Sequence, residues 1–181
     1  HDRCHRSHRE AALPPMSVIA KTLIFTILVP GSITVGMPYL LLSSRLAVYS
    51  YEIGSFRRAG ILPIALGTVF YLWCAWDFAF AGRGTPAPLD PPRLLVTRGL
   101  YRQVRNPIYV GVLLILAGEA VLFESLTLLI YALFVWLVFH IFVVAYEEPT
   151  LKEKFGAAYE EYRKAVPRWI PTGVRAKRNS P

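Results

Sequence analysis

The stretch RLLVTRGLYRQVRNPIYVG, residues 93–111, is a long polar and basic segment that lies between two apolar runs. Its second half places aromatic, basic, Asn and Pro residues directly before the next apolar run. A second polar segment, residues 146–171, follows the last apolar run. We expect these two segments to fold together on one face of a membrane and to form the walls of a single binding pocket.

The composition of the 181-residue chain indicates an integral membrane protein. Hydrophobic residues make up 54% of the chain and charged residues only 18%, with a mean hydropathy of +0.40. About a quarter of the residues are charged in an average soluble domain. The apolar residues also gather in runs of about twenty, the length that crosses about 30 Å of hydrocarbon. We therefore predict an all-α fold, an integral membrane helical bundle.

The apolar runs predict about four transmembrane helices in a single domain, residues 17–181. The expected spans are residues 17–42, 61–81, 106–120 and 123–146. The last two are separated by so few residues that they should form a helical hairpin. A charged amphipathic helix from Glu148 to Ala165 should follow in the cytosol and complete the binding pocket.

Local signals refine these elements. Pro30 and Gly31 should kink or break the first span, provided that neighbours satisfy the freed carbonyl groups. Residues 43–60 connect the first two spans, and their apolar side chains at helical spacing predict a short interfacial helix. Pro107 suits the first turn of its helix, with Asn106 as the N-cap.

Three acidic residues lie in or beside the spans. Asp77 is inside the second span, next to Trp76, where a carboxylate is costly and therefore a candidate functional group. Its place near the span's end would relieve that cost, so its role stays open. Glu119 and Glu124 bracket the tip of the hairpin, where we interpret them as solvated loop acids.

The net charge of +8 and the pI near 9.7 fit a membrane surface better than a nucleic acid. The basic residues flank apolar runs, where the positive-inside rule and anionic lipid headgroups account for them. The linker before the hairpin and the C-terminal segment are basic, whereas the loop near Phe123 carries no Lys or Arg. This asymmetry places the binding pocket on the cytoplasmic side. Arg45, Arg57 and Arg58 are the exception, because they fall on the other side.

The N-terminal segment, residues 1–16, is predicted to be a disordered extension. Cys4 and Cys74 are too few for a disulfide framework. An alternative is a metal site formed by His1, Cys4, His5 and His8, but nothing in the sequence fixes its geometry. No metal is therefore expected.

The exit of the last span carries a candidate constellation. On an α-helix, one stripe contains His140, Val144, Glu147 and Leu151, with Glu148 on its flank. Two adjacent carboxylates repel each other unless a cation or hydroxyl group compensates. They either pair with nearby arginines or bind the ribose hydroxyls or ammonium group of a ligand. The hairpin brings Arg105, Asn106 and Pro107 to the same end of the bundle as the two glutamates, which favours a ligand-binding site there.

Helix termini and aromatic rings suit other parts of such a ligand. The free amide groups near Asn106 and Pro107 could receive a carboxylate. Aromatic faces that could stack on a base or face a cation are supplied by Tyr101, Tyr109, Tyr159 and Trp169.

The strings GLYRQVRNPIYVG, residues 99–111, and YEEPTLKEKFGAAYEEYRKAVPRWIP, residues 146–171, resemble the isoprenylcysteine carboxyl methyltransferase and phospholipid methyltransferase superfamily. The resemblance covers roughly the C-terminal half, with two motifs in the right order and separation. It implies a membrane methyltransferase whose cofactor is S-adenosylmethionine, held in a pocket that faces the cytoplasm. The expected partners are the bilayer and a lipophilic acceptor: an isoprenoid, a prenylcysteine-like molecule or a lipid headgroup.

The resemblance also assigns residues individually. Tyr101 and residues 106–109 match the family's Tyr and His/Asn-Pro-x-Tyr positions, residues 93–96 match the donor-contacting strip before them, and Glu147 matches the first Glu of the Glu-Glu pair. The implied cofactor-binding residues are Arg93, Leu94, Leu95, Val96, Tyr101, Asn106, Pro107, Ile108, Tyr109 and Glu147. Further family elements fall at Phe155-Gly156, Tyr159, Tyr162 and Val166-Pro167.

The sequence departs from the prenylcysteine enzymes at Val143, where they carry a substrate-binding Arg four residues before the Glu pair. The missing guanidinium counts against prenylcysteine itself as the acceptor. If the acceptor carries a proton, His140 or Glu148 is the candidate catalytic base.

Two other functions fit the same pattern. An NADPH-dependent lipid or sterol-type reductase would use basic contacts to the extra phosphate, which Arg98, Arg102 and Arg105 could supply. A non-catalytic membrane scaffold would keep the fold without the chemistry. The oligomeric state is left open by the sequence.

Overall fold

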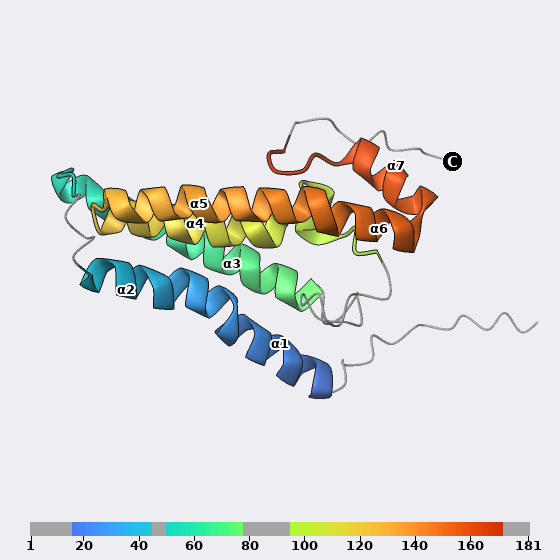
Figure 1. Ribbon diagram of the computed structural model, residues 1–181, viewed down its shortest axis with the longest axis horizontal. Helices are drawn as coiled ribbons and strands as arrows, with labels where there is room; N and C mark the ends of the chain where they lie inside the picture. Colours follow the sequence, from blue (N-terminus) through green and yellow to red (C-terminus); the bar gives the residue numbers. More distant parts are fainter. Residues whose placement is uncertain (1–15, 45–49, 78–94, 172–181) are drawn as a thin grey trace, which may run out of the picture.

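A computed structural model describes residues 16–44, 50–77 and 95–171. Every regular element in these ranges is a helix, as predicted (Figure 1). In chain order the elements are α1 (Met16–Leu28), η1 (Ser32–Gly36), α2 (Met37–Ser43), η3 (Gly54–Gly60), α3 (Ile61–Asp77), η5 (Gly99–Arg102), α4 (Pro107–Leu122), α5 (Leu126–Phe142), η6 (Val143–Glu147), α6 (Glu148–Phe155) and α7 (Ala157–Ala165). The expected N-terminal extension and its possible metal ligands lie outside the described residues, apart from Met16.

Three helices in the described part of the chain are long and apolar enough to cross a membrane. They run over Ala20–Ser43, Gly54–Asp77 and Leu126–Phe155. The fourth expected span, α4, is a shorter apolar helix of 16 residues. At 1.5 Å per residue it is about 24 Å long, less than the full hydrocarbon thickness. The protein is therefore an integral membrane bundle in which one helix of the predicted hairpin is short.

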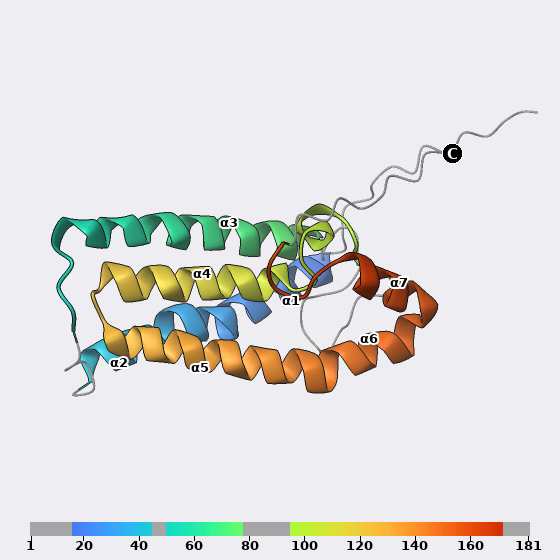
Figure 2. The same ribbon diagram turned by 90° about the horizontal axis from the view of Figure 1, so that it is seen from above.

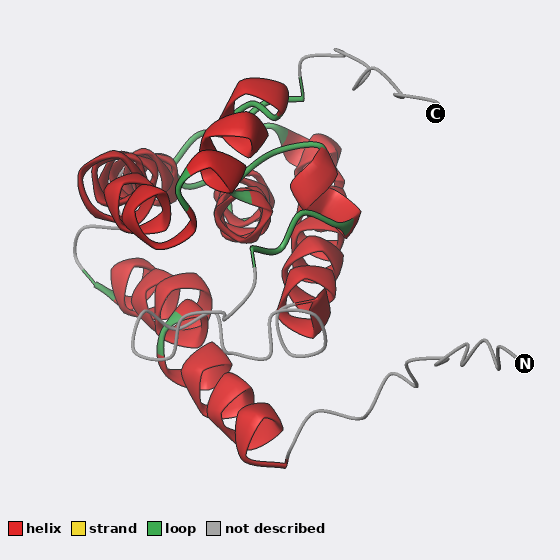
Figure 3. Cartoon of the chain, turned by 90° about the vertical axis from the view of Figure 1, so that its right-hand side faces the viewer, coloured by secondary structure: helices red, strands yellow, loops and turns green. Residues whose placement is uncertain are grey.

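The two ends of the bundle differ in what they carry. The start of α4, the end of α3 and the helices α6 and α7 gather at one end, on the right in Figures 1 and 2. We call this the site end, and Figure 3 views the helices from it. The opposite end, here the hairpin end, holds the turn between α4 and α5 and the start of α3.

Glycine allows α3 and α4 to pack in direct backbone contact. A Cβ added at Gly118 would lie 2.6 Å from the carbonyl oxygen of Gly60, and one at Gly111 would lie 2.9 Å from that of Gly67. Both distances are too short for a real side chain. Small residues are the usual means of close helix packing in membranes, where the hydrophobic effect does not drive helices together.

The first span bends at the predicted place. Figure 1 shows α1 diverging from the line of α2, and the intervening η1 is a π-helical turn. The hydroxyl group of Thr34 donates to the carbonyl oxygen of Pro30 at 2.8 Å, and Tyr131 of α5 donates to that of Ile33 at 3.1 Å. Hydroxyl groups therefore satisfy two carbonyl groups close to the bend, those of Pro30 and Ile33.

The connector before α3 corrects the predicted start of the second span. Ser50 is bridged to Ser125, residues 51–53 have no regular secondary structure, and the described helix within residues 43–60 is the 3-10 helix η3. The 3-10 helix η3 then continues directly into α3, so the second span begins at Gly54, seven residues earlier than expected.

Glu124 is a second correction at the same end. Its carboxylate accepts hydrogen bonds from the backbone N–H groups of Ile53 and Gly54, at 2.9 and 3.0 Å. It is therefore not a solvated loop acid. Its carboxylate ties the hairpin tip to the start of the second span, a long-range pairing that the local sequence does not reveal.

Candidate cofactor site at the end of the bundle

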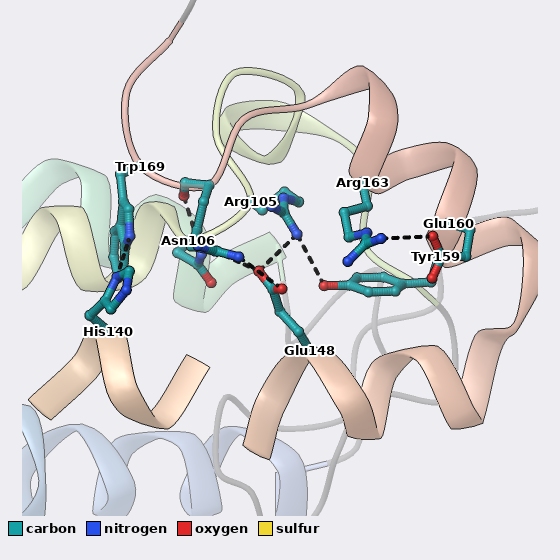
Figure 4. A network of polar contacts seen from close by, with 9 residues as sticks. Arg105, Asn106, His140, Glu148, Tyr159, Glu160, Arg163 and Trp169 are labelled. Atoms are coloured by element: carbon teal, nitrogen blue, oxygen red, sulfur yellow. Dashed lines mark hydrogen bonds and ion pairs between the residues drawn. The ribbon is translucent and has the colours of Figure 1, made fainter. Parts of the chain in front are cut away.

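The two polar segments that the sequence singled out meet at the site end. Arg105 donates to the carboxylate of Glu148 at 2.9 Å, and the hydroxyl group of Tyr109 donates to that of Glu147 at 2.8 Å. Both contacts join the start of α4 to the far end of the last span. The expectation that these segments lie together is confirmed. Figure 4 shows the part of this network around Glu148.

The two neighbouring glutamates have different partners. Glu147 is half-buried and receives its hydrogen bond from a neutral phenol. Glu148 is buried and receives hydrogen bonds from two guanidinium groups, that of Arg105 and that of Arg168, the latter at 2.6 and 3.0 Å. The two hydrogen bonds to Glu148 raise the pKa of Arg168, so this side chain stays charged. Of the two interpretations of the glutamate pair, arginine pairing describes Glu148.

A π-helical turn sets the direction of both glutamates. The segment η6 runs from Val143 to Glu147, and the buried face steps five residues, from Val143 to Glu148. Ordinary α-helical spacing is three or four residues. The predicted stripe through Val144 is therefore wrong, because Val144 is 41% exposed whereas Val143 is only 1% exposed. Single π turns are frequent at functional sites.

The chain after α7 crosses the start of α4, and we call its residues 166–170 the C-terminal strap. The backbone N–H of Arg105 donates to the carbonyl oxygen of Pro167 at 2.8 Å. The side chain of Asn106 donates to the carbonyl oxygen of Arg168 at 3.2 Å. Asn106 is the N-cap residue of α4 and Pro107 lies in its first turn, as predicted. The side chain of Asn106 makes no capping hydrogen bond, and its amide group holds the strap instead.

Aromatic rings line the strap's contact with the bundle. The indole N–H of Trp169 donates to Nδ1 of His140 at 3.2 Å, and the two rings stack with centroids 6.2 Å apart. The ring of Tyr109 neighbours those of Trp169 and Phe139, with centroid distances of 6.4 and 4.7 Å. His140 and Tyr109, both expected at the site, thus share one aromatic neighbour.

Tyr101 occupies a second, buried cluster at this end. It lies in the turn η5 and packs with Cys74 of α3 and with Val96, and Ile108 lies against them. The hydroxyl group of Tyr162 in α7 donates to the carbonyl oxygen of Tyr101 at 2.7 Å. Burial raises the pKa of both phenols, so both are neutral at physiological pH.

Most of the sequence-predicted donor residues therefore lie at one end of the bundle. The residues with contacts given above are Val96, Tyr101, Asn106, Ile108, Tyr109 and Glu147, and Pro107 begins α4 beside them. Leu95 is half-buried next to Val96. Arg93 and Leu94 lie outside the described residues, so their expected role stays a prediction.

Sequence reasoning missed Arg168 as part of this network. The only signal for it was its place directly after the Val166-Pro167 element, in a segment that was expected near the glutamates. Cys74 was also missed as a neighbour of Tyr101, because a lone apolar cysteine in a span carries no local signal.

The first polar segment and the start of the second fall within the match to a known protein family. The profile of the phospholipid methyltransferase family matches residues 56–158, more than half of the chain. The chain belongs to the phospholipid methyltransferase family. The match begins in η3 and ends in α7, so it includes both Asn106-Pro107-Ile108-Tyr109 and the two glutamates.

Two relatives are similar in sequence to this chain over part of their length. The protein-S-isoprenylcysteine O-methyltransferase of Schizosaccharomyces pombe is 40% identical over 79 residues, which are 43% of this chain and 33% of that protein. Protein-S-isoprenylcysteine O-methyltransferase B of Arabidopsis thaliana is 37% identical over 78 residues, 42% of this chain and 39% of that protein. The chain thus matches between a third and two fifths of the length of these relatives.

Proposed function

We propose that this protein is an S-adenosylmethionine-dependent methyltransferase that modifies a lipophilic acceptor at the cytoplasmic membrane face. The observation that carries the proposal is the 2.8 Å hydrogen bond between Tyr109 and Glu147. It joins the two segments in which the chain resembles methyltransferases of its family. These residues are 38 positions apart in the sequence, and only the fold brings them together.

The side chains at the site end suit the chemical groups of this donor. A carboxylate can accept several hydrogen bonds, and Tyr109 supplies only one to Glu147, which leaves capacity for ribose hydroxyl groups. The rings of Tyr109 and Trp169 offer faces for an adenine base or a sulfonium cation. Described residues thus offer partners for the ribose, the base and the sulfonium group of the donor.

When bound, S-adenosylmethionine would supply a methyl group on a positively charged sulfur. A lone pair of the acceptor would attack the methyl carbon from the side opposite the sulfur, which would leave as a neutral thioether. The task of the chain's residues is then alignment and the exclusion of water, which can account for most of the acceleration. The strap and the start of α4 provide fixed walls, because the backbone N–H of Arg105 donates to Pro167 at 2.8 Å and the side chain of Asn106 donates to Arg168 at 3.2 Å.

The contacts of the two candidate bases favour positioning roles. Glu148 is held by Arg105 and Arg168, so we propose that it orders the site. An indole N–H can only donate, so Nδ1 of His140 must accept from Trp169, and a neutral imidazole then carries its proton on Nε2. We propose that His140 helps to hold the strap through this contact.

The acceptor is proposed to be lipophilic because the site lies at the ends of membrane-length helices. Val143, which stands where the prenylcysteine enzymes carry Arg, is only 1% exposed. It therefore offers neither charge nor surface to an acceptor. We propose an acceptor whose recognition does not need a carboxylate contact at this position, such as an isoprenoid or a lipid headgroup.

The charge distribution supports a cytoplasmic orientation of the site end. Basic residues at this end of the described chain include Arg98, Arg102, Arg105, Lys152, Lys154, Arg163, Lys164 and Arg168. At the hairpin end, the described part contains Arg57 and Arg58. Lys and Arg are in excess on the cytoplasmic side of membrane proteins.

The NADPH-dependent reductase is less well supported. Of the three arginines that could bind the extra phosphate, Arg98 pairs with Asp77 at 3.0 Å and Arg105 pairs with Glu148 at 2.9 Å. Binding a phosphate would require breaking these ion pairs. Comparison of thermal stabilisation by S-adenosylhomocysteine and by NADPH separates the two functions. A scaffold without chemistry would respond to neither ligand.

The proposal is tested by methyl transfer from labelled S-adenosylmethionine to a membrane lipid extract, with protein purified in lipid nanodiscs. We expect transfer by the wild type and a loss of at least about a hundredfold in Glu147→Ala, the scale of removing one well-placed polar contact from an active site. Glu124→Gln is the matched control, since it alters a carboxylate at the hairpin end and should retain activity. Equal rates for the wild type and Glu147→Ala would refute the proposal.

A further inference from the structure

Asp77 is a buried carboxylate at the site end to which the proposed reaction gives no role. It is the last residue of α3 and only 6% exposed. A carboxylate at the end of a membrane span is usually relieved by water, but this one is enclosed by protein. A buried charge costs free energy unless partners compensate it, so its contacts indicate what it is for.

The contacts of Asp77 are with the turn that follows the linker. Its Oδ1 accepts a hydrogen bond from Nε of Arg98 at 3.0 Å. Its Oδ2 packs so closely on Gly99 that a Cβ there would collide with it, and that Cβ would also lie 3.2 Å from Nε1 of Trp73. Gly99 has φ +57°, a left-handed conformation that favours glycine. Glycine at position 99 therefore allows both the left-handed backbone of the turn and its close contact with Asp77.

This turn presents Tyr101. The turn η5 begins at Gly99, and Tyr101 packs on Cys74, which lies one helical turn before Asp77 on α3. On its other side, the carbonyl oxygen of Tyr101 receives the hydroxyl group of Tyr162. The last turn of α3 and the helix α7 thus hold η5 from two sides.

We propose that Asp77 is a positioning residue for the methyl donor. Through Arg98 and Gly99 it fixes the turn that places Tyr101 at the donor site, while it touches neither donor nor acceptor itself. Arg98 is the accessible half of this pair, since its side chain is 49% exposed whereas that of Asp77 is 8% exposed. The inference rests on the proposed function and adds to it a residue from outside the two motif segments.

The proposal predicts a selective loss of donor affinity. We expect Asp77→Asn and Arg98→Ala each to weaken S-adenosylhomocysteine binding about tenfold, measured by calorimetry in nanodiscs, because contacting pairs couple on this scale. The KM for the donor should rise in parallel, whereas the KM for the acceptor and kcat stay within about twofold. Arg98→Lys should restore most of the affinity. The double variant should be no worse than either single variant, because both act through one contact.

The control is Glu124→Gln at the hairpin end, which should lower the melting temperature without changing donor affinity. Arg98→Ala removes a half-exposed side chain, so it keeps the test decisive even if Asp77→Asn fails to fold. Unchanged affinity in Arg98→Ala, or an equal loss in Glu124→Gln, would overturn the inference. If the wild type does not bind S-adenosylhomocysteine, the proposed function fails and this inference fails with it.

Discussion

The hairpin end and the site end both hold carboxylates, but with different kinds of partner. At the hairpin end, Glu124 accepts from the backbone N–H groups of Ile53 and Gly54. At the site end, Glu147 and Glu148 accept from side chains of α4 and the strap. Backbone donors are fixed by the course of the chain, whereas side-chain donors can turn towards a ligand. The same chemical group is therefore held by backbone groups at one end and by side chains of the candidate site at the other.

The cost of each arrangement also differs. Arg105 and Glu148 have side chains only 10% and 11% exposed, so each depends on the other for compensation of its charge. Glu124 lies beside Arg57 at 3.9 Å, and that arginine is 57% exposed. Removal of a carboxylate should consequently be more damaging at the site end.

The largest expected effect is that of Glu148→Ala. It leaves Arg105 and Arg168 without their common partner, and breaking a buried ion pair costs about 3–5 kcal/mol. We expect a corresponding fall in the free energy of unfolding, followed by denaturant titration in detergent, together with loss of S-adenosylhomocysteine binding. Arg163→Ala, which removes an exposed guanidinium on α7, is the control. A small effect for Glu148→Ala would show that the network is not the main support of the site end.

Glu124→Ala should come next, at about 1.5–3 kcal/mol, the range for hydrogen bonds to a charged group. Its effect should be confined to stability, because its partners are backbone groups far from the site. The free energy of unfolding and the donor affinity are measured on the same preparation. If folded Glu124→Ala protein bound the donor more weakly than the wild type, the expected difference between the hairpin end and the site end would be refuted.

Gly118→Ala tests the contact between α3 and α4 on the hairpin side. A methyl group there would meet the backbone of Gly60, and overpacking of this kind costs about 1–3 kcal/mol. We expect a lower melting temperature with unchanged donor affinity. Ala117→Gly is the matched control, because Ala117 is exposed on the same helix. A variant as stable as the wild type would show that the helices can separate without loss.

The smallest effect is expected for Trp169→Phe. It removes the indole N–H that donates to His140 and keeps an aromatic ring, so stability should fall by only about 0.5–1.5 kcal/mol. The free energy of unfolding, followed by denaturant titration in detergent, measures this effect. Stability equal to that of the wild type would show that the hydrogen bond from Trp169 to His140 does not help to hold the strap.

Much of the architecture was predictable from the sequence because bilayer thickness sets the length of apolar runs. All three long spans, the short helix α4 and the bend near Pro30 follow from run length and proline placement. The meeting of the two polar segments was also predictable, since a hairpin returns its helices to the same end. The roles of Glu124 and Asn106 were not, because both bond to residues distant in the sequence.

The sequence by itself determined that this chain is an all-α membrane protein with two motif segments on one face. These properties depend on hydrophobicity and local order, which each segment carries alone. The tertiary structure decided how the glutamates divide their partners, through the π turn at residues 143–147 and the strap. It also decided that Asp77 pairs with Arg98, directly before the turn that carries Tyr101. Such pairings depend on distances between segments far apart in the chain, and those distances exist only after the helices have packed.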